Sequence, residues 1–195
     1  MILVHHRRNT AAELRATPPE WGVEVDIRSQ GGELVIHHDP FVAGEPFGTW
    51  LDAYHHRLVI LNVKEEGLEE RVLAEMAARG IESFFFLDQS FPFLIRTARA
   101  GERRCAVRVS EYESIDTALS LAGLIDWVWV DCFSRFPLDR AEAERLRAAG
   151  FRLCLVSPEL QGRADPAEIE AMRALIAERG ITIDAVCSKT PERWQ

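Results

Sequence analysis

The sequence predicts an α/β fold, a compact (β/α)8 TIM barrel with short loops. Short apolar, β-branched runs alternate with helical patterns along the whole chain, which is typical of parallel α/β architecture. Several of these runs are almost continuously apolar, as strands buried on both faces are. The chain has 195 residues, close to the lower limit of ~200 residues for such a barrel, so nearly every loop has to be short. We therefore expect residues 1–195 to form one domain.

Eight apolar runs are the expected strands. In chain order they are Ile2–His6, Gly22–Ile27, Leu58–Lys64, Phe84–Asp88, Cys105–Val109, Trp127–Asp131, Arg152–Val156 and Ile183–Cys187. A doubly wound open sheet is the alternative, because it shows the same alternation of strands and helices.

The intervals between these runs contain apolar residues at helical spacing. The rows are Leu68, Val72 and Met76; Ile115, Leu119 and Ala122; and Ile169, Met172 and Ile176. Helix ends are marked by Gly80, Gly101, Gly150 and Gly180, and a helix start by Asp165-Pro166. Only Thr190–Gln195 follows the last expected strand, so the eighth helix should be reduced or absent.

Composition restricts the classes of partner. The net charge is −8 and the arginines are scattered among acidic residues, which argues against nucleic acid. No apolar run approaches the ~20 residues of a membrane span, and Met1–Val4 is too short for a signal-peptide core, so we expect a cytoplasmic protein without stable membrane insertion. The four cysteines form no Cys-x-x-Cys pair and are expected to be buried, reduced thiols. Composition does not define an oligomeric state.

Two acidic residues lie on one expected strand. Glu24 and Asp26 share one face because side chains alternate along a strand. Two neighbouring buried carboxylates repel each other unless a cation lies between them, and carboxylate oxygens suit Mg²⁺ or Ca²⁺. The alternative is a purely structural pair of acids, held by ion pairs with Arg7 and Lys64.

The six histidines occur as three adjacent pairs. His6 ends the first expected strand, and a glycine turn at Gly31-Gly32 predicts a hairpin that returns His38 to the strand-two carboxylates. Two such histidines can act as acid and base near neutral pH, an arrangement worth ~10²–10⁴-fold in rate. His55-His56 follows a helix-like stretch and is interpreted as structural.

The order of these motifs resembles the glycerophosphodiester phosphodiesterase family, within the phospholipase-C-like phosphodiesterase barrels. The matching motifs are His6-Arg7, Asn9-Thr10, Gly22-x-Glu24-x-Asp26, His38-Asp39, Asn62-x-Lys64, Ser90-Phe91 and, faintly, Ser188-Lys189-x-Pro191. The resemblance implies metal-assisted hydrolysis of a small-molecule phosphodiester of the glycerol-phosphate type. It assigns acid–base catalysis to His6 and His38, phosphate binding to Arg7 and Lys64, and Mg²⁺ or Ca²⁺ ligation to Glu24, Asp26 and Asn62.

Three departures from the family pattern leave other functions open. Asn62 stands where the family has an acidic metal ligand, Val156 stands where a tryptophan is expected, and the insertion after His38-Asp39 is nearly absent. One alternative is a catalytically impaired barrel that binds a phosphate ligand or acts as an accessory protein. Another is an unrelated metal-dependent lyase or aldolase that uses Lys64.

Overall fold

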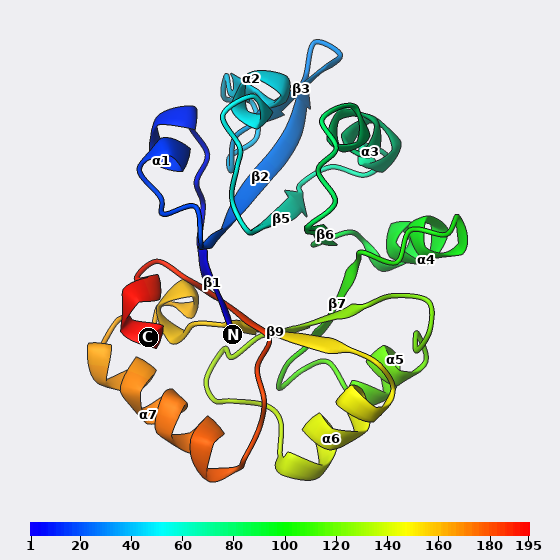
Figure 1. The fold of residues 1–195 in the computed structure, drawn as a ribbon. Helices are drawn as coiled ribbons and strands as arrows, with labels where there is room; N and C mark the ends of the chain where they lie inside the picture. The colour runs from blue at the N-terminus through cyan, green and yellow to red at the C-terminus, as the bar shows by residue number, and fades with distance from the viewer.

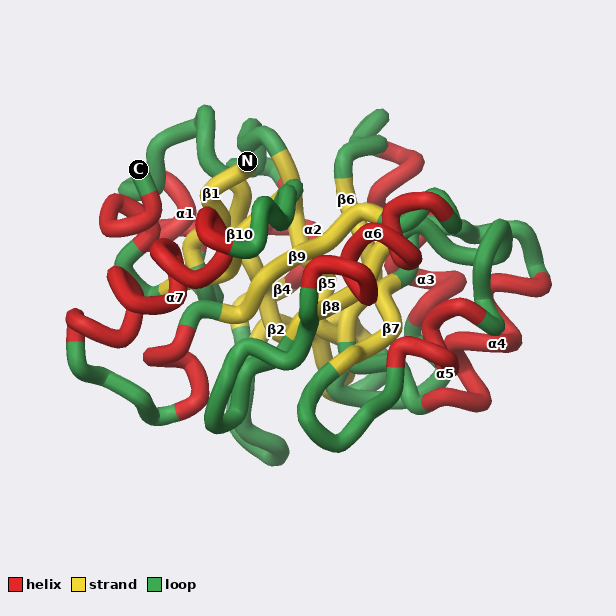
Figure 2. Tube along the Cα trace, turned by 90° about the horizontal axis from the view of Figure 1, so that it is seen from below, coloured by secondary structure: helices red, strands yellow, loops and turns green.

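The computed structural model describes residues 1–195 and shows an α/β fold with a curled sheet. The strands lie in the middle of the molecule and the helices surround them (Figure 1). Seen after a 90° turn, the strands again cross the centre with helices on the outside (Figure 2). None of the helices combines the length and apolar character needed to cross a membrane.

All eight expected strands are present. They are β1 (Ile2–His5), β2 (Gly22–Gln30), β5 (Leu58–Val63), β6 (Phe84–Leu87), β7 (Ala106–Val109), β8 (Trp127–Val130), β9 (Arg152–Val156) and β10 (Ala185–Ser188). The expected hairpin adds β3 (Glu33–Ile36), antiparallel to β2, and a short β4 (Glu45–Pro46) beside it.

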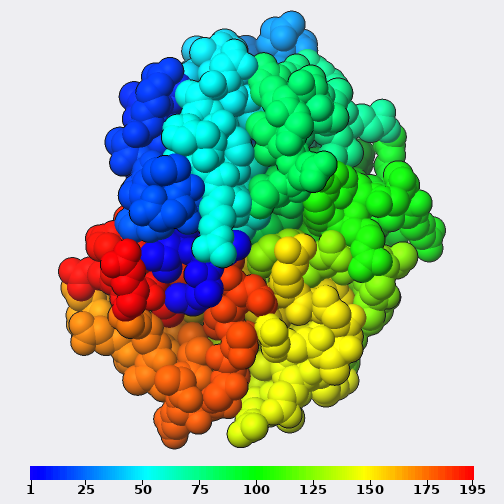
Figure 3. Space-filling view, in the orientation of Figure 1, coloured from blue at the N-terminus to red at the C-terminus, as the bar shows by residue number.

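The eight strands pair in parallel. β1 lies between β2 and β10, β5 lies between β2 and β6, and β7, β8, β9 and β10 follow one another. β6 and β7 are joined only by a single bridge between Phe86 and Cys105. The sheet therefore curls until its first and last parallel strands meet, which a doubly wound open sheet does not do. In the space-filling view the start of the chain, in dark blue, lies against its red end (Figure 3).

The helices alternate with these strands. They are α1 (Ala11–Arg15), α2 (Phe47–Leu51), α3 (Glu69–Ala78), α4 (Phe91–Arg99), α5 (Ile115–Leu119), α6 (Arg140–Ala148) and α7 (Pro166–Glu178), with 3-10 turns η1 (Pro158–Gln161) and η2 (Pro191–Trp194). The short η2 replaces the eighth helix, as expected. Its Trp194 is buried, and the indole N–H donates a hydrogen bond of 2.9 Å to Ser157 Oγ.

The expected helix signals hold with one exception. Asp165 caps α7 by accepting a hydrogen bond from the Ala167 N–H, and each predicted helix-ending glycine has a positive φ angle. The exception is Ala122, which is exposed because α5 already ends at Leu119. The other two apolar rows are buried throughout.

Alternation along the strands produces two separate cores. Val59, Leu61 and Val63 of β5 join the larger cluster of 43 buried residues, which lies between the strands and the helices. Leu58 and Ile60 join a cluster of 12 buried residues drawn mainly from the opposite faces of the parallel strands. Inward-facing residues near the carboxyl ends of the strands lie above this inner core, where parallel α/β enzymes carry their catalytic groups.

Candidate active site

The acidic pair lies on the inner face of the sheet. Val23 and Val25 face the outer core, so Glu24 and Asp26 point inward, and each is only 1% exposed. Asn62 of β5 is the register partner of Asp26, and its Nδ2 donates a hydrogen bond of 2.9 Å to Glu24 Oε1. The structure therefore brings the three expected metal ligands together.

Basic groups surround the acids. Lys64 Nζ lies 3.2 Å from Asp26 Oδ1, and Arg7 Nε lies 3.5 Å from Asp26 Oδ2. Arg7 has a positive φ of 54°, a rare conformation for a side chain of its size, and its backbone N–H donates a bond of 2.8 Å to Glu24 Oε2. Asn9 Nδ2 also donates to Asp26 Oδ2, at 2.8 Å. The ion pairs expected for a purely structural acidic pair are thus present in part.

Burial shifts the pKa values of Glu24 and His6. Desolvation and then the neighbouring Asp26 charge raise the pKa of Glu24 to about 7, against the hydrogen bonds from Asn62 and Arg7. His6 Nε2 lies 3.6 Å from Glu24 Oε2, and its pKa is lowered to about 3, first by burial and then by the Arg7 charge.

His38 is placed less closely than expected. The hairpin forms, but β3 ends at Ile36 and the chain bends before His38. The His38 side chain is 41% exposed, its Nδ1 lies 2.7 Å from Asp39 Oδ1, and it makes no hydrogen bond or ion pair with Glu24 or Asp26. The hydrogen bond with His38 lowers the pKa of Asp39. Neither residue lines the cavity that holds the acidic pair.

The remaining histidines lie elsewhere. His5 faces away from the acids and its ring packs edge-on against Trp21, with ring centroids 6.1 Å apart. His56 is buried and its Nε2 lies 3.0 Å from the Thr17 carbonyl oxygen, in agreement with a structural role.

Sequence reasoning missed a second group of charges on the opposite side of the site. Arg108 of β7 contacts Asp88 and donates a bond of 2.9 Å from Nη1 to Asp131 Oδ2, while Gln161 Nε2 donates a bond of 2.6 Å to Asp131 Oδ1. Lys64 Nζ, 3.7 Å from Asp88 Oδ2, links this group to the acidic pair. Asp88 therefore pairs with two cations, Lys64 and Arg108. The sequence contained one signal for this group: alternation of side chains along the strand places Arg108 on the inner face.

These residues line one cavity of about 190 Å³. It includes six of the seven expected site residues, the exception being His38; the lining residues are His6, Arg7, Glu24, Asp26, Asn62, Lys64, Leu87, Asp88, Arg108, Trp129, Asp131, Val156, Leu160 and Gln161. Four of the fourteen are carboxylates and three are permanently basic, so with all four acids ionised and His6 neutral the cavity has one net negative charge.

The donor set fits a divalent cation. Asn62 Oδ1 is buried and has no hydrogen-bond partner, which is costly unless something positive approaches it. It lies beside two buried carboxylates in a negatively charged cavity. No three His, Cys, Asp or Glu side chains gather as a metal cluster, so the amide oxygen of Asn62 would complete the set.

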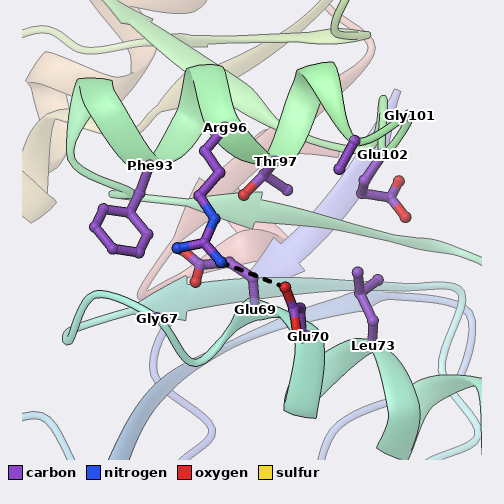
Figure 4. Close-up of a pocket in the computed structure, with 10 residues that line it drawn as sticks. Gly67, Glu69, Glu70, Leu73, Phe93, Arg96, Thr97, Gly101 and Glu102 are labelled. Carbon is purple, nitrogen blue, oxygen red and sulfur yellow. Dashed lines mark hydrogen bonds and ion pairs between the residues drawn. The ribbon is translucent and has the colours of Figure 1, made fainter.

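Other hollows lie beside this cavity or away from it. A groove of about 430 Å³ runs between α3 and α4, where Arg96 Nη2 approaches Glu70 Oε1 at 3.5 Å (Figure 4). It is formed by outer helices and shares no residue with the site. A cleft of about 630 Å³ opens beside β6 and β7, and this one shares Leu87, Asp88 and Arg108 with the site.

Comparison with solved structures identifies relatives of this fold. The chain superposes on a glycerophosphodiester phosphodiesterase from Agrobacterium tumefaciens with a TM-score of 0.64 and 14% identity, covering 100% of this chain and 99% of that one. It superposes on a glycerophosphoryl diester phosphodiesterase from Parabacteroides distasonis with a TM-score of 0.69 and 12% identity, covering 98% and 84%. The chain has the fold of these phosphodiesterases. The family resemblance of the sequence motifs is thus confirmed at the level of the fold. No family model and no curated protein matches the sequence.

Proposed function

We propose that this chain is a metal-assisted phosphodiester hydrolase acting on a small-molecule ester of the glycerol-phosphate type. The observation that carries the proposal is the convergence of His6, Arg7, Glu24, Asp26, Asn62 and Lys64 on one cavity at the carboxyl ends of parallel strands. We further infer that the curled sheet is a complete (β/α)8 barrel in a single domain, closed at the Phe86–Cys105 bridge, and that the protein is cytoplasmic.

Phosphate binding is proposed for Arg7 and Lys64. Both side chains reach the buried acids from the cavity side, and both remain partly accessible. A phosphodiester anion in the cavity would exchange one carboxylate partner of each cation for a phosphoryl oxygen. Their positive charges would then stabilise the charge that grows on the phosphoryl oxygens in the transition state.

Metal binding is proposed for Glu24, Asp26 and Asn62. A bound Mg²⁺ or Ca²⁺ would supply Lewis-acid stabilisation of the phosphoryl group. Asn62 positions Glu24 through the bond from its Nδ2, and its free Oδ1 would contribute the third protein oxygen.

Proton transfer is proposed for His6 and His38. A hydroxyl of the substrate attacks phosphorus and gives its proton to one imidazole, while the oxygen of the departing alcohol takes a proton from the other as its P–O bond breaks. The resulting cyclic phosphate is opened by water to a monoester. His38 does not line the cavity, so this step requires a movement of the loop that follows Ile36.

Hydrolysis of glycerophosphocholine and bis(p-nitrophenyl) phosphate, with and without Mg²⁺, Ca²⁺ or Mn²⁺, tests the proposal. Metal-dependent release of alcohol supports it. Absence of turnover on any phosphodiester, with retained binding of glycerol 3-phosphate, would favour the second candidate, a barrel that binds phosphate ligands without catalysis. The exposed position of His38 and the amide at position 62 are the observations behind that candidate.

A further inference from the structure

The seam between β6 and β7 differs from every other junction in the parallel sheet. All other neighbours share at least two register pairs, whereas β6 and β7 meet only at the Phe86–Cys105 bridge. Beyond this bridge the two strands share no pairing, and the cleft of about 630 Å³ opens there between the loops that follow β6 and β7 and helices α4 and α5.

This cleft is continuous with the phosphate site. Leu87, Asp88 and Arg108 line both spaces, so the Arg108–Asp88 ion pair stands at their boundary. The site cavity, at about 190 Å³, falls below the ~300–1,000 Å³ of typical ligand pockets, whereas the cleft lies within that range. A ligand larger than a phosphate with a short alcohol therefore gains more room in this direction than in the hollow of about 230 Å³ beside Lys64 and Asp88, where only one of eight lining residues is hydrophobic.

The walls of the cleft indicate the chemistry of its occupant. Six of its twelve lining residues are hydrophobic: Leu87, Phe91, Leu94, Ala106, Val107 and Tyr112. Five of the six polar ones already have protein partners: Asp88, Gln89, Arg108, Glu113 and Ser114. Gln89 Oε1 is buried and has no partner, so the cleft offers one free acceptor beside its six hydrophobic side chains.

Two exposed aromatic side chains line this cleft. Tyr112, on the loop that follows β7, is 82% exposed, and Phe91, the first residue of α4, is 48% exposed. Large apolar side chains in water beside a charged site are typical of ligand-binding surfaces, because a ligand removes them from water.

We propose that this cleft binds an apolar extension of the substrate, so that the preferred phosphodiester carries an alkyl or aryl group beyond a glycerol-sized alcohol. The proposal rests on the proposed function, because the charged part of that substrate has to occupy the cavity of Arg7 and Lys64. Arg108 then marks the point where the polar part of the ligand ends.

Calorimetry with two monoester products tests the cleft proposal separately from the proposed function. Glycerol 3-phosphate probes the charged cavity alone, and its octanoyl ester adds a chain for the cleft. A fully buried methylene is worth roughly fourfold in affinity, so a chain that is partly buried should bind at least ~10-fold more tightly than glycerol 3-phosphate. Equal affinities would overturn the cleft proposal and leave the proposed function standing. No binding of either ester, with or without Mg²⁺ or Ca²⁺, would overturn both.

Variants show where the additional affinity for the octanoyl ester arises. Thr117 is exposed on α5 and lines the cleft, so Thr117→Trp should fill it and bring the ratio of the two affinities close to one. Tyr112→Ser, also at an exposed position, should reduce the ratio by several-fold. Ala100→Trp is the matched control, because Ala100 is exposed and lines the groove between α3 and α4. An equal loss in this control, or an unchanged ratio in Thr117→Trp, would count against the cleft.

Discussion

His6 and His5 are neighbours in sequence with opposite surroundings. His6 faces Glu24, and His5 packs against Trp21. His6→Ala should reduce turnover of an activated phosphodiester by on the order of 10²-fold or more, because proton transfer is lost. His5→Ala is the control and should lower the melting temperature more than the rate. If the His5 variant loses activity and the His6 variant keeps it, the assignment of proton transfer to His6 is wrong.

Substitution of Asn62 tests metal binding. Asn62→Asp removes the donor to Glu24 and adds a third buried negative charge, so the variant should melt at a lower temperature without metal. With a compensating cation present, Mg²⁺ or Ca²⁺ affinity should rise on the order of tenfold. Titration calorimetry and melting curves with and without metal measure the two effects.

Asn9→Asp is the matched control for this experiment. Asn9 also contacts Asp26, but it is not a proposed ligand. If both variants tighten metal binding equally, only the general charge of the site matters and Asn62 has no ligand role.

Strand parity explains which site residues the sequence could predict. Glu24, Asp26 and His6 lie on strands or directly after them, where alternation of side chains holds. The same rule fails at His38 because β3 ends two residues earlier, at Ile36, and parity has no meaning in a bend. Arg108 and Asp131 were missed because each looks like an isolated polar residue in an apolar run, and their contact exists only once β7 and β8 are adjacent.

Among the elements, the loop that follows β8 depends on one carboxylate. Glu111 accepts hydrogen bonds from the backbone N–H groups of Phe133, Ser134 and Arg135. Partial burial acts to raise the pKa of Glu111, but the bonds from Ser134 and Arg135 outweigh it and lower the value from 4.5 to about 2.

Glu111→Gln should therefore destabilise the protein by about 2 kcal/mol at neutral pH. Because the pKa is lower in the folded protein, this contribution is present above pH 4.5 and is lost as the pH falls through about 2. Urea unfolding of the wild type and the variant at several pH values measures the difference. Glu113→Gln is the control, since Glu113 accepts a side-chain bond only from Ser110. A difference that persists at pH 2 would rule out this explanation.

The β3–β4 arm requires a glycine at position 44. A Cβ there would lie 2.5 Å from the Ile36 carbonyl oxygen. Gly44→Ala should therefore cost about 2 kcal/mol of unfolding free energy, because backbone has to move. At Gly48 the nearest atom to an added Cβ is the end of the Arg79 side chain, at 3.3 Å, so Gly48→Ala should cost much less. Equal melting temperatures for the two variants would contradict this.

The sequence predicts the positions of the strands and helices better than the residues at which they end. Apolar runs locate every parallel strand, because strands covered on both faces leave a continuous signal. β2 extends beyond the expected Ile27 to Gln30, since the antiparallel β3 supplies hydrogen-bond partners that a local pattern does not reveal. α5 stops at Leu119 for a similar reason, since Gly123 follows with a positive φ and the chain turns toward β8.

At the scale of the whole molecule, the cysteines report on the integrity of the fold. Cys105, Cys132, Cys154 and Cys187 are free and buried, as the sequence predicts, and burial raises the pKa of each thiol. A thiol reagent should therefore label none of them in the native protein within minutes, and all four in denaturant. Counting modified thiols by mass spectrometry checks this. Rapid labelling of the native protein would show that one of these sites opens to solvent.

The pairing of β1 with β10 has a consequence for synthesis of the chain. Residues 2–5 can acquire their second neighbour only when residues 185–188 have left the ribosome. Until then the nascent chain carries two unpaired strand edges, which are prone to pair with other chains. Completion of the sheet is thus a late, long-range event, and contacts of such sequence separation form slowly. Ribosome-bound chains that end before β10 should accordingly be far more sensitive to protease than the released protein.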